Sequence, residues 1–140
     1  MTKVLINIDV DDILKAEMFY TKALDLKVGR RFADDFIELL GDSCVFYLLK
    51  KDEGSKIYPS AREGRSYARH WTPVHVDFVV DDIERTRAKL EREGAVFSEV
   101  SKIRTAPYGK IFECSDPFGH GLCVIQFLGR GYDELLTPQK

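Results

Sequence analysis

The hydrophobic positions of this chain follow the same order twice. Residues 3–10 form an apolar, β-branched run that predicts a strand, and Val10-Asp11-Asp12-Ile13 leads from it into a helix. The stretch Val80-Asp81-Asp82-Ile83 repeats that sequence 70 residues later, which is half of the 140-residue chain. The pattern therefore predicts a duplicated module.

The first module is expected to run strand, helix, strand, strand, strand. After the helix, the segments 26–32, 36–40 and 44–49 predict strands separated by polar turns. The last of them is almost continuously apolar, which is typical of a strand buried on both faces. The helix is predicted from apolar residues at helical spacing: Ile13, Ala16, Phe19, Tyr20, Ala23 and Leu24.

The second module repeats this order. Its helix is predicted over 82–93, with Asp81 as N-cap, Glu84 completing a capping box and Gly94 as the C-terminal stop. Cys44-Val45 and Cys123-Val124 occupy comparable places and form a second, weaker trace of duplication. The predicted strands are 73–80, an irregular strand at 95–103, 110–114 and 122–128.

A polar connector, 51–72, separates the modules. A connector of this length is either a lid or binding loop, or a mobile linker, and both interpretations stay open. We expect one domain over 1–140, with module one at about 3–50, module two at about 73–128 and a surface tail at 129–140.

Composition indicates a soluble globular protein, with 44% hydrophobic and 31% charged residues. A net charge of −2 does not suit binding to nucleic acid. No apolar run reaches the roughly 20 residues of a membrane span, and residues 1–6 enter a strand pattern directly, without a signal segment. Cys44, Cys114 and Cys123 are odd in number and widely spaced, which favours reduced thiols and a cytoplasmic protein.

With Phe19-Tyr20 in the first helix and Asp116-Pro117-Phe118-Gly119 before the last strand, the chain resembles the vicinal oxygen chelate superfamily. This superfamily includes glyoxalase I, extradiol dioxygenases, bleomycin-resistance proteins and fosfomycin-resistance enzymes. The resemblance implies an α+β fold in which two βαβββ modules form a cup-shaped, pseudo-symmetric sheet pair, commonly completed in a homodimer.

Enzymes of this superfamily hold a divalent metal in the cup through His, Gln or Glu on the first and last strands of each module. Carried over to this chain, His75 falls on a ligand position, but Leu5 stands at the matching place in module one. Cys123 stands where Glu is expected, and the fourth position falls at Tyr47 or at Cys44. Because such an ion needs about three protein donors, we expect no metal; His75 is the one well-matched ligand position, and a divalent metal is disfavoured.

Other side chains could serve the cup. Trp71 could stack on an aromatic ligand or plug the open end of the sheet. Glu38 or Glu113 could act as a general base if it points into the cup, or could lie on the wet face. His120 is expected as an exposed turn residue and Cys123 as a small hydrophobe. The predicted ligand-binding residues are His75, Trp71, Tyr47, Cys123 and Glu38.

These features favour a glyoxalase/bleomycin-resistance-like protein that binds a small molecule in its cup without the usual metal. The alternative is a metal-dependent lyase, isomerase or dioxygenase acting on a vicinal-oxygen substrate. A third possibility is a cup without ligand, kept as a dimeric structural or regulatory domain. Whether the protein is an enzyme stays open; if it is one, a glyoxalase-like lyase or a dioxygenase is expected.

Overall fold

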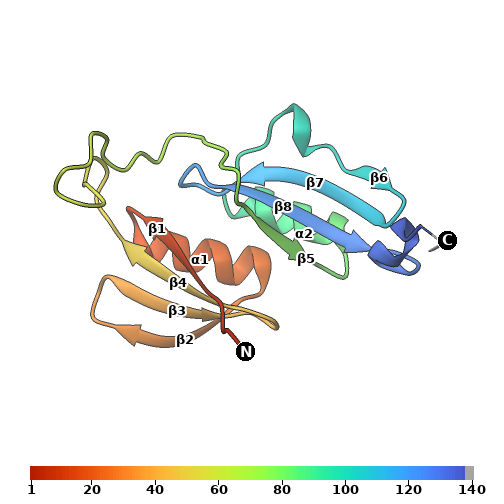
Figure 1. Ribbon diagram of the computed structural model, residues 1–140, viewed down its shortest axis with the longest axis horizontal. Helices are drawn as coiled ribbons and strands as arrows, with labels where there is room; N and C mark the ends of the chain where they lie inside the picture. The colour runs from red at the N-terminus through yellow and green to blue at the C-terminus, as the bar shows by residue number, and fades with distance from the viewer. Residues whose placement is uncertain (138–140) are drawn as a thin grey trace.

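The computed structural model describes residues 1–137 and confirms the duplicated α+β architecture. Within that range, two four-stranded mixed sheets are each backed by one helix (Figure 1). The first module contains β1 (Leu5–Val10), α1 (Ile13–Leu24), β2 (Lys27–Phe32), β3 (Phe36–Leu40) and β4 (Val45–Lys50). The second contains β5 (Val76–Val79), α2 (Ile83–Arg92), η1 (Glu99–Ser101), β6 (Arg104–Ala106), β7 (Gly109–Ser115), β8 (Gly121–Phe127) and η2 (Gly131–Leu135).

The strand orders of the two sheets match, β1-β4-β3-β2 and β5-β8-β7-β6, with β1 and β5 facing each other across the middle of the molecule (Figure 1). β1 runs parallel to β4 and pairs Asn7 with Tyr47; β5 runs parallel to β8 and pairs Asp77 with Cys123. Asn7 and Asp77 are related by the 70-residue repeat, so Tyr47 is the counterpart of Cys123. The Cys-Val match that favoured Cys44 is therefore out of register.

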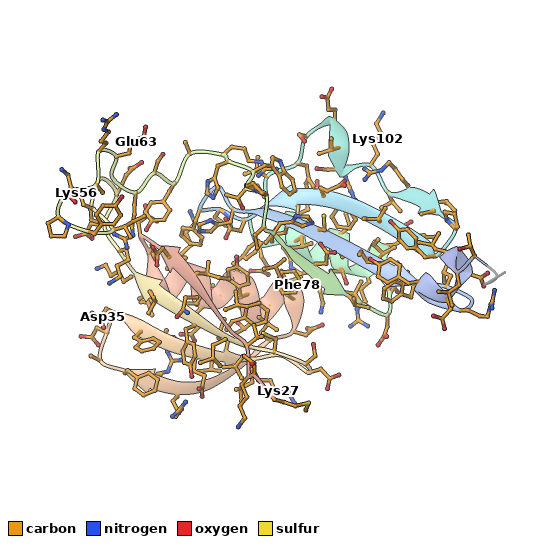
Figure 2. The ribbon with its side chains drawn as sticks, in the orientation of Figure 1. Lys27, Asp35, Lys56, Glu63, Phe78 and Lys102 are labelled. Atoms are coloured by element: carbon orange, nitrogen blue, oxygen red, sulfur yellow. The ribbon has the colours of Figure 1, made fainter. Side chains whose placement is uncertain are left out.

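One hydrophobic core spans both modules, and Tyr20 lies within it. The Tyr20 hydroxyl, on α1, donates a hydrogen bond of 2.6 Å to Oδ2 of Asp116 in the other module. Burial, reinforced by that carboxylate, raises the pKa of Tyr20 well above its ordinary value. Figure 2 shows Phe78 between the modules, where its ring stacks on Phe46 of β4 with centroids 5.7 Å apart.

Helix α2 begins one residue later than predicted. Its N-cap is Asp82, whose carboxylate accepts a 2.9 Å hydrogen bond from the backbone N–H of Arg85. Asp81 therefore lies outside the helix, and the capping box predicted with Glu84 does not form. The reason is that Ile83 is completely buried and occupies the first helical position. The predicted stop at Gly94 is confirmed, with φ of +97°.

Three predicted strands differ from the structure. β5 is shorter than 73–80, and 95–103 holds η1 and a single bridge from Val96 to Ser115 instead of an irregular strand. β4 is not buried on both faces: Phe46 and Leu48 are buried, whereas Tyr47 is half-buried. A single helix covers one face of each sheet, so the opposite face stays open.

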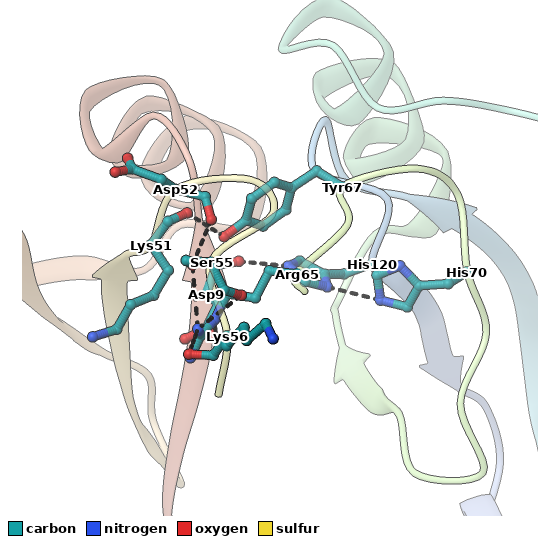
Figure 3. Close-up of polar contacts among 9 residues, drawn as sticks. All are labelled: Asp9, Lys51, Asp52, Ser55, Lys56, Arg65, Tyr67, His70 and His120. Carbon is teal, nitrogen blue, oxygen red and sulfur yellow. Dashed lines mark hydrogen bonds and ion pairs between the residues drawn. The ribbon is translucent and has the colours of Figure 1, made fainter. Parts of the chain in front are cut away.

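The connector folds back on itself and onto β1. The Gly54 N–H donates to the Arg65 carbonyl at 2.7 Å, and the Arg65 N–H donates to the Ser55 carbonyl at 2.8 Å. The Arg65 guanidinium also contacts Asp9 of β1 at 2.7 Å (Figure 3). The connector is thus tied to the first module. Among residues 1–137, no helix is long and apolar enough to cross a membrane.

Candidate functional site

The sheet faces opposite the helices carry polar residues at equivalent positions. In the first sheet Glu38 lies opposite Tyr47, and in the second Glu113 lies opposite Cys123. Each glutamate binds an arginine from the neighbouring edge strand, Arg30 or Arg104. The duplication therefore extends from the backbone to these glutamate–arginine pairs. The two sheet faces differ mainly in the other side chains that lie on them.

In the first sheet, Arg30 and Tyr47 engage Glu38. The Arg30 Nε lies 3.0 Å from Glu38 Oε1, and the Tyr47 hydroxyl donates to Oε2 at 2.9 Å. Hydrogen bonding to Arg30 lowers the pKa of Glu38 to about 2, although desolvation opposes the shift. A carboxylate of this acidity is a poor general base near neutral pH. Glu38 and Tyr47 thus form a structural network in the first module.

The second sheet carries a pocket of about 490 Å³ instead. It contains three residues predicted from the sequence (Trp71, His75 and Cys123) and excludes Tyr47 and Glu38, which lie on the other sheet. The lining residues are Trp71, His75, Asp77, Val100, Tyr108, Ile111, Glu113, Cys123, Ile125 and Tyr132.

Trp71 forms one wall of this pocket. Its indole packs over the start of β8, where a Cβ added at Gly121 would lie 2.4 Å from the ring. The Arg69 guanidinium lies 4.3 Å from the indole centroid, and the His75 ring lies 6.1 Å away in an edge-to-face arrangement. Gly121 is therefore needed for the indole to reach this position, between the end of the connector and the pocket.

Two tyrosines that sequence reasoning missed form the opposite wall. Tyr108 and Tyr132 have ring centroids 5.0 Å apart, and Phe127 packs against Tyr132 at 4.7 Å. Tyr132 comes from η2, in the tail that was predicted only as surface; residues 138–140 of that tail lie outside the described part of the chain. The available signal was the one aromatic residue of the tail, Tyr132.

At the floor of the pocket, the donor atoms of His75, Asp77 and Cys123 lie within 4.8 Å of one another. His75 Nε2 is 3.1 Å from Asp77 Oδ1. Asp77 was also missed, although its position two residues after His75 indicates the same side of the chain. Burial, with Asp77 and Glu113 nearby, raises the pKa of the Cys123 thiol to about 12, which is unsuited to a nucleophile.

A nitrogen, an oxygen and a sulfur donor fit a divalent metal such as zinc in number and kind. The arrangement departs from the one that the superfamily resemblance implies, because these donors all come from the second module. On the first module, Leu5 offers no donor and is exposed, while Tyr47 is engaged by Glu38. The sequence identified His75 as well matched; folding brings two further donors beside it.

His120 was predicted as an exposed turn residue, and this prediction is wrong. The residue is half-buried, and its Nε2 lies 2.7 Å from the backbone carbonyl of Asp9 (Figure 3). Its Nδ1 lies 3.1 Å from Nε2 of His70. The turn carrying His120 is pressed against the connector and β1, contacts that no local pattern in the sequence indicates.

Solved structures of other proteins share the overall fold of this chain. The fosfomycin resistance protein FosX from Listeria monocytogenes is 13% identical, with a TM-score of 0.70 over 97% of this chain and 98% of its own. TnmS3, an antibiotic binding protein from Streptomyces sp. CB03234, is 18% identical, with a TM-score of 0.63 over 91% and 97%. An integron cassette protein from V. cholerae is 23% identical, with a TM-score of 0.61 over 91% and 96%.

At these identities the likeness concerns the fold alone. No curated protein matches the sequence. A family model for the glyoxalase-like domain matches residues 5–125, which is most of the chain. On that match, and with both modules in place, this chain belongs to the glyoxalase-like domain family.

Proposed function

We propose that this protein binds a small molecule in the pocket of the second module. The observation that carries the proposal is the pocket itself: about 490 Å³, with aromatic walls and polar groups at its floor. That volume lies within the range of about 300–1,000 Å³ usual for small-ligand sites. The equivalent face of the first module is occupied by the contacts among Arg30, Glu38 and Tyr47.

The lining suggests the ligand's chemistry. Trp71 and Tyr132 offer aromatic surface for a flat apolar body. Asp77 is substantially exposed at the floor, whereas Glu113 is neutralised by Arg104. A planar molecule carrying a hydrogen-bond donor or a positive charge suits this combination. TnmS3 shares the fold and is an antibiotic binding protein; we extend small-molecule binding to this chain, but not the identity of the ligand.

A thermal-shift screen of planar aromatic and cationic compounds tests this function. A compound at 100 times its Kd stabilises its target by about 2.7 kcal/mol, which is readily detected. We expect Trp71→Ala and His75→Ala to remove the shift. Tyr58→Ala, which removes an exposed aromatic residue of the connector outside the pocket, is the matched control. Full binding by both pocket variants would place the site elsewhere.

The grouping of His75, Asp77 and Cys123 supports a second candidate, a metal-dependent enzyme acting on a vicinal-oxygen substrate. These three side chains would hold the ion, and a bound divalent metal would supply Lewis-acid chemistry. Protein purified without chelator should then contain close to one divalent ion per chain. Absence of an ion, together with an unchanged melting temperature in added zinc, nickel, manganese or iron, would exclude this candidate.

We also propose a cytoplasmic homodimer. Leu5 and Val79, on the two facing edge strands, are more than half exposed, and a second copy would cover such apolar side chains. Cys44, Cys114 and Cys123 are free thiols, as suits a reducing compartment. Analytical ultracentrifugation should give twice the chain mass; a monomer at micromolar concentration would contradict the dimer.

A further inference from the structure

The connector ends against the turn between β7 and β8, where two histidines meet (Figure 3). His70 Nδ1 lies 3.0 Å from the carbonyl oxygen of Ala68, and His120 Nε2 lies 2.7 Å from that of Asp9. The two remaining ring nitrogens, His70 Nε2 and His120 Nδ1, face each other at 3.1 Å. Every ring nitrogen of the pair thus has one partner.

These contacts determine how many protons the two rings hold. A carbonyl oxygen only accepts, so the nitrogens facing Ala68 and Asp9 must each carry a hydrogen. Between the facing nitrogens, two lone pairs or two hydrogens would repel, whereas one hydrogen makes a bond. The complete set of bonds therefore needs three ring protons, which gives the pair a single positive charge.

The surroundings accommodate this charge. The carboxylate of Asp9 pairs with Arg65, and Oδ1 of Asp116 accepts the backbone N–H of His120 at 2.9 Å. The Arg69 guanidinium donates to the carbonyl of His70, and the Tyr67 ring meets the His120 ring edge-to-face with centroids 6.3 Å apart. His75 is a further titratable group lining the same cleft between the modules. The charged groups around the pair come from several elements and include both carboxylates and guanidiniums. These surroundings are compatible with a single positive charge on the two rings.

The pair also adjoins the indole wall of the pocket. The backbone N–H of His70 donates to the backbone carbonyl of Gly119 at 3.0 Å, and Trp71 is the next residue along the chain. A Cβ at Gly119 would lie 2.2 Å from the carbonyl oxygen of Ala68, so connector and turn are in close contact here. Holding His70 against His120 therefore holds Trp71 over the start of β8.

We propose that His70 and His120 share one proton and act together as positioning residues for Trp71 in the ligand pocket. This inference rests on the proposed binding function. If the third ring proton is removed, either His70 Nε2 and His120 Nδ1 face each other with two lone pairs, or one ring loses its hydrogen bond to a carbonyl. If a fourth proton is added, both of these facing nitrogens carry a hydrogen, and the two hydrogens repel. Either change releases the end of the connector and lets Trp71 leave the pocket wall.

Trp71 is the single tryptophan of the chain, so its fluorescence reports this position without any ligand. We expect its emission to change with pH. His70→Ala and His120→Ala should abolish the shift. His70→Gln, whose amide replaces Nε2 but does not titrate, should keep the emission of the folded protein constant. His75→Gln is the control for the other ring near Trp71, and the shift should survive in it.

Nitrogen NMR of the histidine rings in the ligand-free protein gives the second readout. Near neutral pH, three of the four ring nitrogens of His70 and His120 should carry hydrogen. Two or four such nitrogens, or a Trp71 shift that persists in both alanine variants, would overturn the shared proton.

Proflavine, a planar cationic dye, serves as the binding probe. Its Kd should rise about five- to tenfold in His120→Ala, the cost of ordering one side chain on binding, and should stay near wild type in His70→Gln. An unchanged Kd in His120→Ala would overturn the positioning role. If proflavine fails to bind the wild-type protein, the proposed ligand class is wrong, and the shared proton is still judged by Trp71 emission and ring NMR.

Discussion

Tyr47 and Cys123 occupy the same position in the two modules, each on the last strand and directly opposite the repeat-related residues Asn7 and Asp77. In module one, the phenol of Tyr47 reaches Glu38 and helps to fill the sheet face. In module two, the smaller thiol leaves space that Trp71 and Tyr132 enclose. The residue at this one repeated position therefore distinguishes the filled face of the first sheet from the pocket on the second sheet.

Cys123→Tyr should therefore close the pocket. The added ring would occupy the space between Asp77 and Glu113, and we expect binding of any pocket ligand to be lost while the protein stays folded. Overpacking typically costs about 1–3 kcal/mol. Calorimetric titration measures the loss of ligand binding, and circular dichroism checks that the protein stays folded. Cys44→Tyr, at a half-exposed thiol outside the pocket, should retain binding; the same loss there would contradict this account.

Tyr20→Phe should loosen the joint between the modules. It removes the hydroxyl that donates to Oδ2 of fully buried Asp116, and an unsatisfied buried acceptor costs about 1–3 kcal/mol. Urea unfolding should show this loss in the free energy of unfolding. The matched control, Tyr58→Phe at an exposed connector site, should change it by less than about 0.5 kcal/mol. Equal effects in the two variants would mean that the bond contributes nothing.

Glu38 should contribute to acid sensitivity. Its pKa falls from 4.5 to about 2 through Arg30, so its stabilising contribution is present above the unfolded-state value and is lost as pH falls through the folded value. Between about pH 5 and 2, Glu38→Gln should lose less stability than the wild-type protein. Glu53→Gln, in an exposed stretch of the connector, should follow the wild-type curve. Parallel curves for Glu38→Gln and wild type would contradict the shift.

Cobalt(II) tests the donor group at the pocket floor. If His75, Asp77 and Cys123 bind a metal, cobalt should produce a thiolate-to-metal charge-transfer absorption, because the sulfur is deprotonated on coordination. Cys123→Ser should remove this band, and Asp77→Asn should weaken cobalt binding because it removes a charged oxygen donor. Cys44→Ser should leave the spectrum intact. A band that survives in Cys123→Ser belongs to another thiol.

Much of the architecture follows from local pattern. Apolar residues at helical spacing, such as Ala16 and Phe19, predicted α1, and the repeated Asp-Asp-Ile turn predicted the second module. The first signal is local, since helix faces are set by the chain's own geometry, whereas the second compares two stretches 70 residues apart. Even so, the N-cap of α2 is Asp82 and not the predicted Asp81, because the burial of Ile83 fixes where the helix begins.

The sequence by itself determined the duplication, the order of elements, the family resemblance and His75 as a polar point in the second module. Tertiary structure decided that Asp77 and Cys123 join His75, that Tyr132 from the tail closes the pocket, and that His120 meets His70. Except for His75 and Asp77, which are two residues apart, those contacts join residues far apart in the chain, such as His70 on the connector and His120 in the turn between β7 and β8. Strand register and connector packing set them, and neither leaves a periodic trace in the sequence.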